Sequence, residues 1–120
     1  MIKNLFDLSG RVAVITGGNG GIGLGMAEGL VSQGCEVSIW GTNDDKNAAA
    51  LEKLLAYGPK VSALNCNVAD ETAVQAAFAE TLKIHGRVDG CFANAGIGGS
   101  GTRFDDTSAE EGVDVVTLEE

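Results

Sequence analysis

Residues 11–23 read RVAVITGGNGGIG, and this stretch decides the fold. Its first half is a nearly continuous apolar run over residues 12–15, which is typical of a strand buried on both faces of a parallel sheet. Its second half is rich in glycine and leads into a segment where Ile22, Met26 and Leu30 recur every four residues, the spacing of one helix face. The stretch therefore predicts a buried strand, a glycine-rich turn and a helix in direct succession.

Strands and helices alternate along the rest of the chain. Helix starts are indicated by capping residues at Asn43 and Asp70, and by a capping box formed by Ser108 and Glu111. Further strands are predicted at 36–40, 61–65 and 88–93. This alternation predicts an α/β fold, a doubly wound parallel sheet with helices on both faces. If the third crossover returns past the first strand, about four strands take the order 3-2-1-4, with a ligand crevice between strands one and four.

The apolar residues of the two later helices indicate which helix faces should be buried. The predicted stripe of the second helix is Leu51, Leu54 and Leu55. The predicted stripe of the third helix is Val74, Ala77, Phe78 and Leu82. Gly34 and Gly86 stand where the first and third helices should end, because glycine readily adopts the left-handed conformation that often follows a helix.

Charge and composition narrow the classes of function. Residues 1–100 hold seven basic and ten acidic residues, and residues 101–120 hold one basic and seven acidic residues, for a formal charge of −9. The lack of a basic patch argues against nucleic acid and against an anionic membrane as partners. No apolar run approaches the roughly 20 residues that span a bilayer, and residues 1–10 lack the apolar stretch of a signal peptide, so we expect a cytoplasmic protein.

The cysteines and the single histidine argue against a metal site. Cys35, Cys66 and Cys91 stand far apart in the sequence without a C-x-x-C pair, and His85 is the only histidine. We therefore expect three buried thiols and no metal-binding residue. His85 is expected to be a helix-end residue without a catalytic role, because no partner motif accompanies it.

The glycine-rich turn has a direct chemical use. Glycines permit positive φ angles and let a ligand approach the backbone closely, while the following helix offers free N–H groups and the positive end of its dipole to a pyrophosphate. Residues 18–23 match the dinucleotide pattern G-x-G-x-x-G, and residues 16–23 also fit T-G-x-x-x-G-x-G. Because a predicted strand precedes the turn and a predicted helix follows it, the segment indicates a dinucleotide-binding loop.

Three motifs at matching spacing resemble those of the short-chain dehydrogenase/reductase family. TGGNGGIG at 16–23 resembles the family's cofactor loop, NVAD at 67–70 resembles its D-V-x-D segment, and ANAG at 93–96 is similar to its N-N-A-G. The resemblance covers residues 5–118 and implies a Rossmann-like fold that binds NAD or NADP. Two positions depart from the family's pattern, with asparagine at the first position of the second motif and alanine at the first position of the third.

The resemblance also implies which residues contact the cofactor. The implied cofactor-binding residues are Gly17, Asn19, Gly21, Ile22, Gly23, Thr42, Asn67, Val68, Asn94, Ala95 and Gly96. Asn67 offers both a donor and an acceptor to the adenine. Asn94 is implied to steady the central sheet and to line the cofactor.

The choice between NAD and NADP depends on residues after the second strand. The resemblance places Gly41 where members that prefer NAD tend to carry an acid, and Thr42 where members that prefer NADP tend to carry arginine. Asp44 and Asp45 follow closely, and an unpaired phosphate near two acids would be poorly held, which favours NAD. The same two acids are also well suited to capping the second helix, and this is the better explanation of their presence.

The family's catalytic Tyr-x-x-x-Lys has no counterpart in this sequence. Tyr57 is the only tyrosine, and Tyr57-Gly58-Pro59-Lys60 is one residue short and interrupted by a helix break, so we expect a surface turn. We assign no catalytic residue and expect residues 1–120 to form a single truncated dinucleotide-binding domain, inactive by itself. The resemblance implies that full-length relatives transfer hydride between nicotinamide and a carbonyl or alcohol carbon.

An alternative interpretation is a non-enzymatic nucleotide-binding or protein-interaction domain. Its contact surfaces would be the acidic residues 101–120 and the exposed sheet edge at residues 88–93. The same edge and the exposed helix faces are also expected to favour self-association, because an unpaired strand edge can pair with a second chain.

Overall fold

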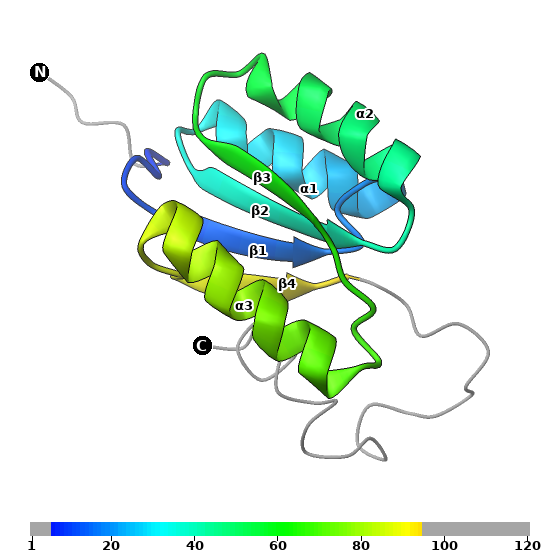
Figure 1. Ribbon diagram of the computed structural model, residues 1–120. Coiled ribbons are helices and arrows are strands. Elements are labelled where there is room, and N and C mark those ends of the chain that lie inside the picture. The colour runs from blue at the N-terminus through cyan, green and yellow to red at the C-terminus, as the bar shows by residue number, and fades with distance from the viewer. Residues whose placement is uncertain (1–5, 95–120) are drawn as a thin grey trace, which may run out of the picture.

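Four parallel strands form one sheet in the computed structural model, which describes residues 6–94 (Figure 1). The strands are β1 (Val12–Thr16), β2 (Glu36–Gly41), β3 (Val61–Asn65) and β4 (Gly90–Ala93). The helices between them are α1 (Gly21–Ser32), α2 (Asp44–Leu55) and α3 (Glu71–His85). The order β3-β2-β1-β4 confirms the predicted topology, while the helix predicted from Ser108 lies outside the described residues.

The helices cover both faces of the sheet, as expected for a doubly wound fold. α1 and α2 lie on one face and α3 lies on the other (Figure 1). One apolar cluster, which includes Ile15, Ile39 and Leu54, fills the layer between the sheet and the first two helices. A second cluster, which includes Trp40 and Ala77, fills the layer under α3. The protein therefore has two core layers separated by one sheet.

β1 lies at the centre of this arrangement. All five of its residues are buried, as the continuous apolar run predicts. Its register places Thr16 beside Trp40 of β2 and beside Ala93 of β4. The chain segments that leave these three strands therefore meet at one edge of the sheet, where the Gly17 amide donates a hydrogen bond to the Trp40 carbonyl at 2.8 Å.

β4 begins two residues later than the strand predicted at 88–93. Asp89 forms two bonds with Val12 that precede the ladder: its amide donates to the Val12 carbonyl, and its carboxylate accepts from the Val12 amide, each at 2.8 Å. β4 is an edge strand of the described sheet, and self-association through this edge stays a prediction.

The helix boundaries follow the signals in the sequence. The Asn43 side chain accepts a hydrogen bond from the Lys46 amide at 3.0 Å, which confirms the predicted cap of α2. The Asp70 side chain likewise caps α3. Gly34 and Gly86 have φ angles of +93° and +84°, so both take the left-handed conformation predicted after a helix end.

The buried face of α1 differs from the prediction. Ile22 is 78% exposed, and the buried residues are Gly23, Ala27 and Val31, one position further along the helix. A residue with little or no side chain lets the helix axis approach the sheet closely, so glycine and alanine line the contact. The apolar periodicity gave the wrong stripe because it counts large side chains and gives little weight to such small contact residues.

The stripes predicted for α2 and α3 are correct only in part. Leu54 and Ala77 are buried as expected, whereas the exposed large side chains include Leu55, Phe78 and Leu82. The buried line of α3 continues through Thr81, whose hydroxyl donates to the Ala77 carbonyl at 2.7 Å. A threonine that satisfies its hydroxyl within its own helix can be buried, and apolar periodicity does not detect it.

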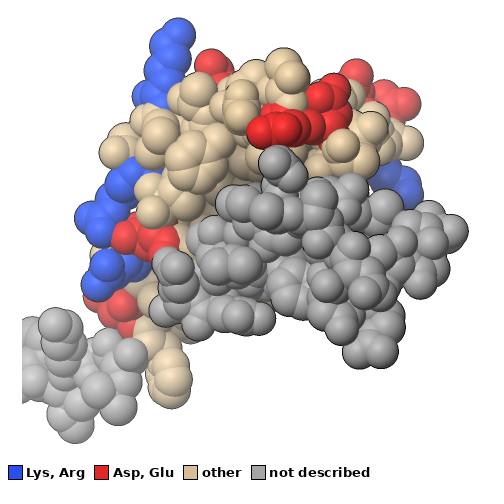
Figure 2. All heavy atoms as spheres, turned by 90° about the horizontal axis from the view of Figure 1, so that it is seen from below, with Lys and Arg blue, Asp and Glu red and all other residues tan. Residues whose placement is uncertain are grey.

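The charged side chains of the described residues are mixed in sign. Figure 2 shows lysine and arginine side chains beside carboxylates along the left side of the view, and further carboxylates at its top. Arg11 and Arg87 both form ion pairs with Asp89. None of the helices in residues 6–94 is both long and apolar enough to cross a bilayer.

All three cysteines are buried thiols, as predicted, and Cys35 gives a pH-dependent signature. Burial raises the pKa of Cys35 from 9.0 to about 11, with the nearby charges of Asp89 and Glu36 contributing. Between pH 9 and about 11 the unfolded chain loses this proton while the folded chain keeps it. We therefore expect the free energy of unfolding to fall with rising pH over this window.

Urea unfolding of the wild-type chain and of Cys35→Ala at pH 8, 9, 10 and 11 tests this expectation. The free energy of unfolding of the wild type relative to Cys35→Ala should be constant up to about pH 8, where the thiol is protonated in both the folded and the unfolded state. Above about pH 8 the wild type should lose stability relative to the variant. Parallel pH profiles of the two proteins up to pH 11 would show that Cys35 titrates alike in both states.

Candidate functional site

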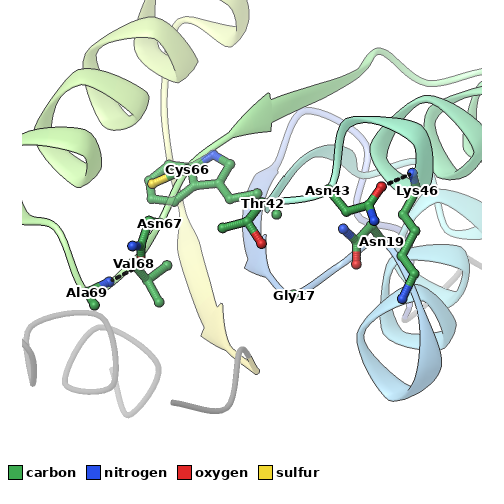
Figure 3. Close-up of a pocket in the computed structure, with 11 residues that line it drawn as sticks. Gly17, Asn19, Thr42, Asn43, Lys46, Cys66, Asn67, Val68 and Ala69 are labelled. Carbon is green, nitrogen blue, oxygen red and sulfur yellow. Dashed lines mark hydrogen bonds between the residues drawn. The ribbon is translucent and has the colours of Figure 1, made fainter. Parts of the chain in front are cut away.

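A pocket of about 400 Å³ opens where β1, β2 and β3 end (Figure 3). Five residues implied by the sequence line it, namely Gly17, Asn19, Thr42, Asn67 and Val68. Six further residues complete the lining, namely Trp40, Gly41, Asn43, Lys46, Cys66 and Ala69. Asn67, Val68 and Ala69 form one side of the pocket in Figure 3, and Asn19, Asn43 and Lys46 form the other. The volume lies within the range of about 300–1,000 Å³ that is usual for small-molecule sites.

The remaining implied residues lie beside this pocket or beyond the described chain. Gly21, Ile22 and Gly23 form the first turn of α1, directly after the glycine-rich turn. Asn94 follows β4, and its side-chain amide donates to the Gly17 carbonyl at 3.4 Å. This bond joins the residue after β4 to the glycine-rich turn. Ala95 and Gly96 lie outside the described residues.

The glycine-rich turn leaves no room for side chains at its closest contact. Gly17 and Gly21 have φ angles of +68° and +56°, which favour glycine. A Cβ atom on Gly23 would lie 2.2 Å from the Gly17 carbonyl oxygen and 2.7 Å from the side-chain nitrogen of Asn94. The start of α1 is thereby held directly against the end of β1.

The amino end of α1 keeps its positive character. Its N-cap is Gly20, which has no side chain to occupy the first amides, and its first turn contains no acidic residue. The amides and the helix dipole can therefore attract an anion such as a pyrophosphate. Ile22 in this turn is exposed.

Asn47 is a structural residue of this site that the sequence reasoning missed. It is 5% exposed, and its side-chain amide donates to the Gly41 carbonyl at 2.9 Å and to the Leu64 carbonyl at 3.4 Å. Its side-chain oxygen accepts from the amide of Asn19 at 2.9 Å. Asn47 thus ties the ends of β2 and β3 to the glycine-rich turn. Asn47 lies on the same face of α2 as the buried Ala50. A polar residue at that position was the only feature of the sequence that could have indicated this role.

The same contact explains the glycine at position 41. A Cβ atom there would lie 2.3 Å from the side-chain nitrogen of Asn19 and 2.7 Å from the side-chain oxygen of Asn47. The hydrogen-bonded pair of amides therefore occupies the space that a side chain at position 41 would need.

The acids that favoured NAD do not line the pocket. Asp44 and Asp45 lie in the first turn of α2, and the carboxylate of Asp44 accepts a hydrogen bond from the side chain of Asn65 at 2.7 Å. Their position fits the capping interpretation. Lys46 is the only charged residue among the eleven that line the pocket.

His85 lies at the opposite end of the strands and has two partners. Its Nε2 is 2.8 Å from the Ser62 hydroxyl and its Nδ1 is 2.7 Å from the Glu36 carboxylate. Its side chain is fully buried. The expectation that His85 is only a helix-end residue was therefore incomplete, because it joins the end of α3 to β2 and β3.

Tyr57 lies on the surface away from the pocket, as predicted. Its hydroxyl donates to the Glu28 carboxylate at 3.0 Å, and this hydrogen bond, with the charge of Glu28, raises the pKa of Tyr57. The contact joins the segment after α2 to α1. It leaves Tyr57 without access to a ligand in the pocket.

Comparisons with known proteins identify a family. Residues 11–118 match the model of the family described as short chain dehydrogenase. The sorbose reductase of Candida albicans is 38% identical over 96 residues, which are 80% of this chain and 34% of that protein. This relative is a reductase by name, and the two solved structures described next are a dehydrogenase and a reductase by name. These matches give no support to the interpretation as a non-enzymatic interaction domain.

Solved structures agree on the fold. NAD⁺-bound xylitol dehydrogenase matches with a TM-score of 0.74 and 26% identity, over 92% of this chain and 42% of that one. L-sorbose reductase from Gluconobacter frateurii, complexed with NADPH and L-sorbose, matches with a TM-score of 0.74 and 31% identity, over 88% of this chain and 40% of that one. The chain thus spans between a third and somewhat over two fifths of these proteins' length.

Proposed function

We propose, from the premise that this chain belongs to the short-chain dehydrogenase family, that its pocket holds the adenosine part of NAD or NADP. The observation that carries the proposal is the contact between Gly23 and Gly17, which brings the uncapped amino end of α1 against the end of β1. A pyrophosphate bound there would receive hydrogen bonds from backbone amides without competition from a side chain. The pocket lies next to this pyrophosphate position, where the adenosine part of the cofactor would be bound.

Each group of implied residues has a role in this proposal. Gly21, Ile22 and Gly23 would hold the pyrophosphate, and Asn19 with Thr42 would face the adenosine ribose. Asn67 and Val68 line the side of the pocket where the adenine would lie, and Asn67 supplies both a donor and an acceptor. Asn94, with Ala95 and Gly96, would continue the contact from β4 toward the rest of the cofactor.

The activity of the whole protein is a further proposal. When bound, the nicotinamide of such a cofactor accepts or supplies a hydride, and we propose a carbonyl or alcohol carbon as the other partner. The matched proteins named as sorbose reductase and xylitol dehydrogenase are oxidoreductases of this kind by name. Because Tyr57 is the only tyrosine and is bonded to Glu28 outside the pocket, we propose cofactor binding without turnover for these 120 residues.

Trp40 provides the test. It is the only tryptophan of the chain, it is buried, and it lines the pocket. We expect NADH and NADPH to quench its emission in a saturable way, because the reduced nicotinamide absorbs light where tryptophan emits. Excess ADP-ribose should reverse the effect by competing for the same pocket. Quenching that rises linearly without saturation, or that ADP-ribose leaves unchanged, would contradict the proposal.

A further inference from the structure

We infer that Lys46 is a specificity-determining residue that makes this pocket prefer NADP to NAD. The inference rests on the proposed function, since it concerns which dinucleotide the same pocket selects. The two cofactors differ by the 2′-phosphate on the adenosine ribose. A site selects NAD by accepting hydrogen bonds from the free ribose hydroxyls with a carboxylate, and NADP by pairing the 2′-phosphate with a cation. The residues around the pocket favour the second solution.

The end of β2 offers no carboxylate acceptor, because the residue there is Gly41. The hydrogen-bonded side chains of Asn19 and Asn47 fill the space beside Gly41, and a Cβ atom there would lie within 2.7 Å of both. The side-chain amide of Asn47 also donates a hydrogen bond to the Gly41 carbonyl. The Asn19 and Asn47 side chains therefore cannot move aside together without breaking that second hydrogen bond. None of the eleven residues that line the pocket is acidic.

The two acidic residues at the start of α2 oppose the binding of a phosphate, but only weakly. Asp44 and Asp45 share the first helical turn with Lys46, and their charges lower the positive potential there. Neither lines the pocket, and the carboxylate of Asp44 is bonded to Asn65 at the end of β3. A phosphate in the pocket would therefore meet Lys46 more closely than it meets either acid.

Lys46 supplies the cation. Its side chain lines the pocket on the side of Asn19 and Asn43 (Figure 3). Within residues 6–94 no carboxylate forms an ion pair with it, whereas Lys53 of the same helix pairs with Glu28 at 3.5 Å. The Lys46 charge is thus available to a ligand. It stands in the first turn of α2, where the amide dipoles also favour an anion.

Two nucleotide fragments isolate this contact from the rest of the cofactor. Calorimetric titration of the 120-residue chain with adenosine 2′,5′-bisphosphate and with 5′-AMP compares ligands that differ only in the 2′-phosphate. We expect the bisphosphate to bind about two- to fivefold more tightly at low salt, the factor expected of one exposed ion pair. The advantage should shrink as salt is added, because an exposed lysine and a phosphate are screened.

The matched variants are Lys46→Met and Lys53→Met, which remove one charge each from the same helix. The advantage of the bisphosphate over 5′-AMP, taken as the ratio of the two affinities within each protein, should disappear in Lys46→Met and persist in Lys53→Met. Lys46→Gln serves as a second variant of similar length. Circular dichroism melts establish that each variant is folded.

The outcomes separate this inference from the proposed function. Equal affinity of the wild-type chain for the two fragments, or an advantage that survives in Lys46→Met, overturns the inference, even where NADH and NADPH still quench Trp40. A folded chain that binds neither fragment and shows no saturable quenching overturns the inference and the proposed function together.

Discussion

Replacing Gly23 with alanine is expected to abolish saturable dinucleotide binding and to lower the free energy of unfolding by about 1–3 kcal/mol. The new Cβ would lie 2.2 Å from the Gly17 carbonyl oxygen, which belongs to the backbone and cannot rotate away. The start of α1 must therefore move off the end of β1. That movement displaces the amides and the helix dipole that we propose for the pyrophosphate.

The matched control is Gly25→Ala in the same helix. Gly25 is exposed, and a Cβ atom placed on it meets no other atom within 4 Å. Alanine there should raise the free energy of unfolding by about 0.5–1 kcal/mol, because glycine weakens a helix interior. Urea unfolding and Trp40 quenching measure the two effects. If Gly23→Ala binds NADPH as tightly as the wild type does, the tight contact at Gly17 is irrelevant to the cofactor.

Replacing His85 with leucine is expected to cost about 1–3 kcal/mol of stability without changing cofactor affinity. The imidazole bonds both to the Ser62 hydroxyl and to the Glu36 carboxylate, and its side chain is fully buried. Leucine leaves both groups without this partner. Most of the loss should come from buried Ser62, since Glu36 retains 30% side-chain exposure and can recover water.

Lys83→Leu and a double-mutant cycle provide the controls for His85. Lys83 lies exposed in the same last turn of α3, so its replacement should change stability by less than about 0.5 kcal/mol. Ser62→Ala combined with His85→Leu should cost less than the sum of the single changes, because the two residues share a bond. Additive losses in urea unfolding would show that the bond contributes nothing. A weakened affinity for NADPH would show that this end of the sheet is coupled to the pocket.

The sequence predicts the strands and the glycine-rich turn well because their signals are local. The apolar run of β1 and the glycines after it specify a buried strand and a tight turn without reference to distant residues. The helix caps at Asn43 and Asp70 bond to amides no more than three residues away, so the starts of α2 and α3 could be predicted equally well. The order of the strands followed from their alternation with helices and from the expectation that the third crossover returns past the first strand.

The helix faces were harder to predict because packing favours residues that periodicity ignores. α1 contacts the sheet through Gly23 and Ala27, while Ile22 faces outward. α3 buries Thr81 in preference to Phe78. In each case the rotation of the helix about its own axis decides which residue faces the sheet, and that rotation is a property of the assembled fold.

The contacts of Asn47 and His85 could not be predicted because each joins three separate parts of the chain. Asn47 bonds to Asn19 and to two strand ends, 6 to 28 residues away in sequence. His85 bonds to residues 23 and 49 positions away. The sequence favoured NAD because of Asp44 and Asp45, whereas the charged residue that lines the pocket is Lys46, and the inference about NADP rests on this difference.

Backbone amide shifts of the labelled 120-residue chain, recorded by NMR during titration with NADPH, test the central claim most directly. We predict saturable shifts at Gly17, Asn19 and Thr42, and at Asn67 and Val68 across the pocket, with Ser62 and His85 unchanged at the far end of the strands. Shifts confined to the region of Ser62, His85 and Glu36, or no shift at any concentration in a folded sample, would contradict the assignment of this pocket to a dinucleotide.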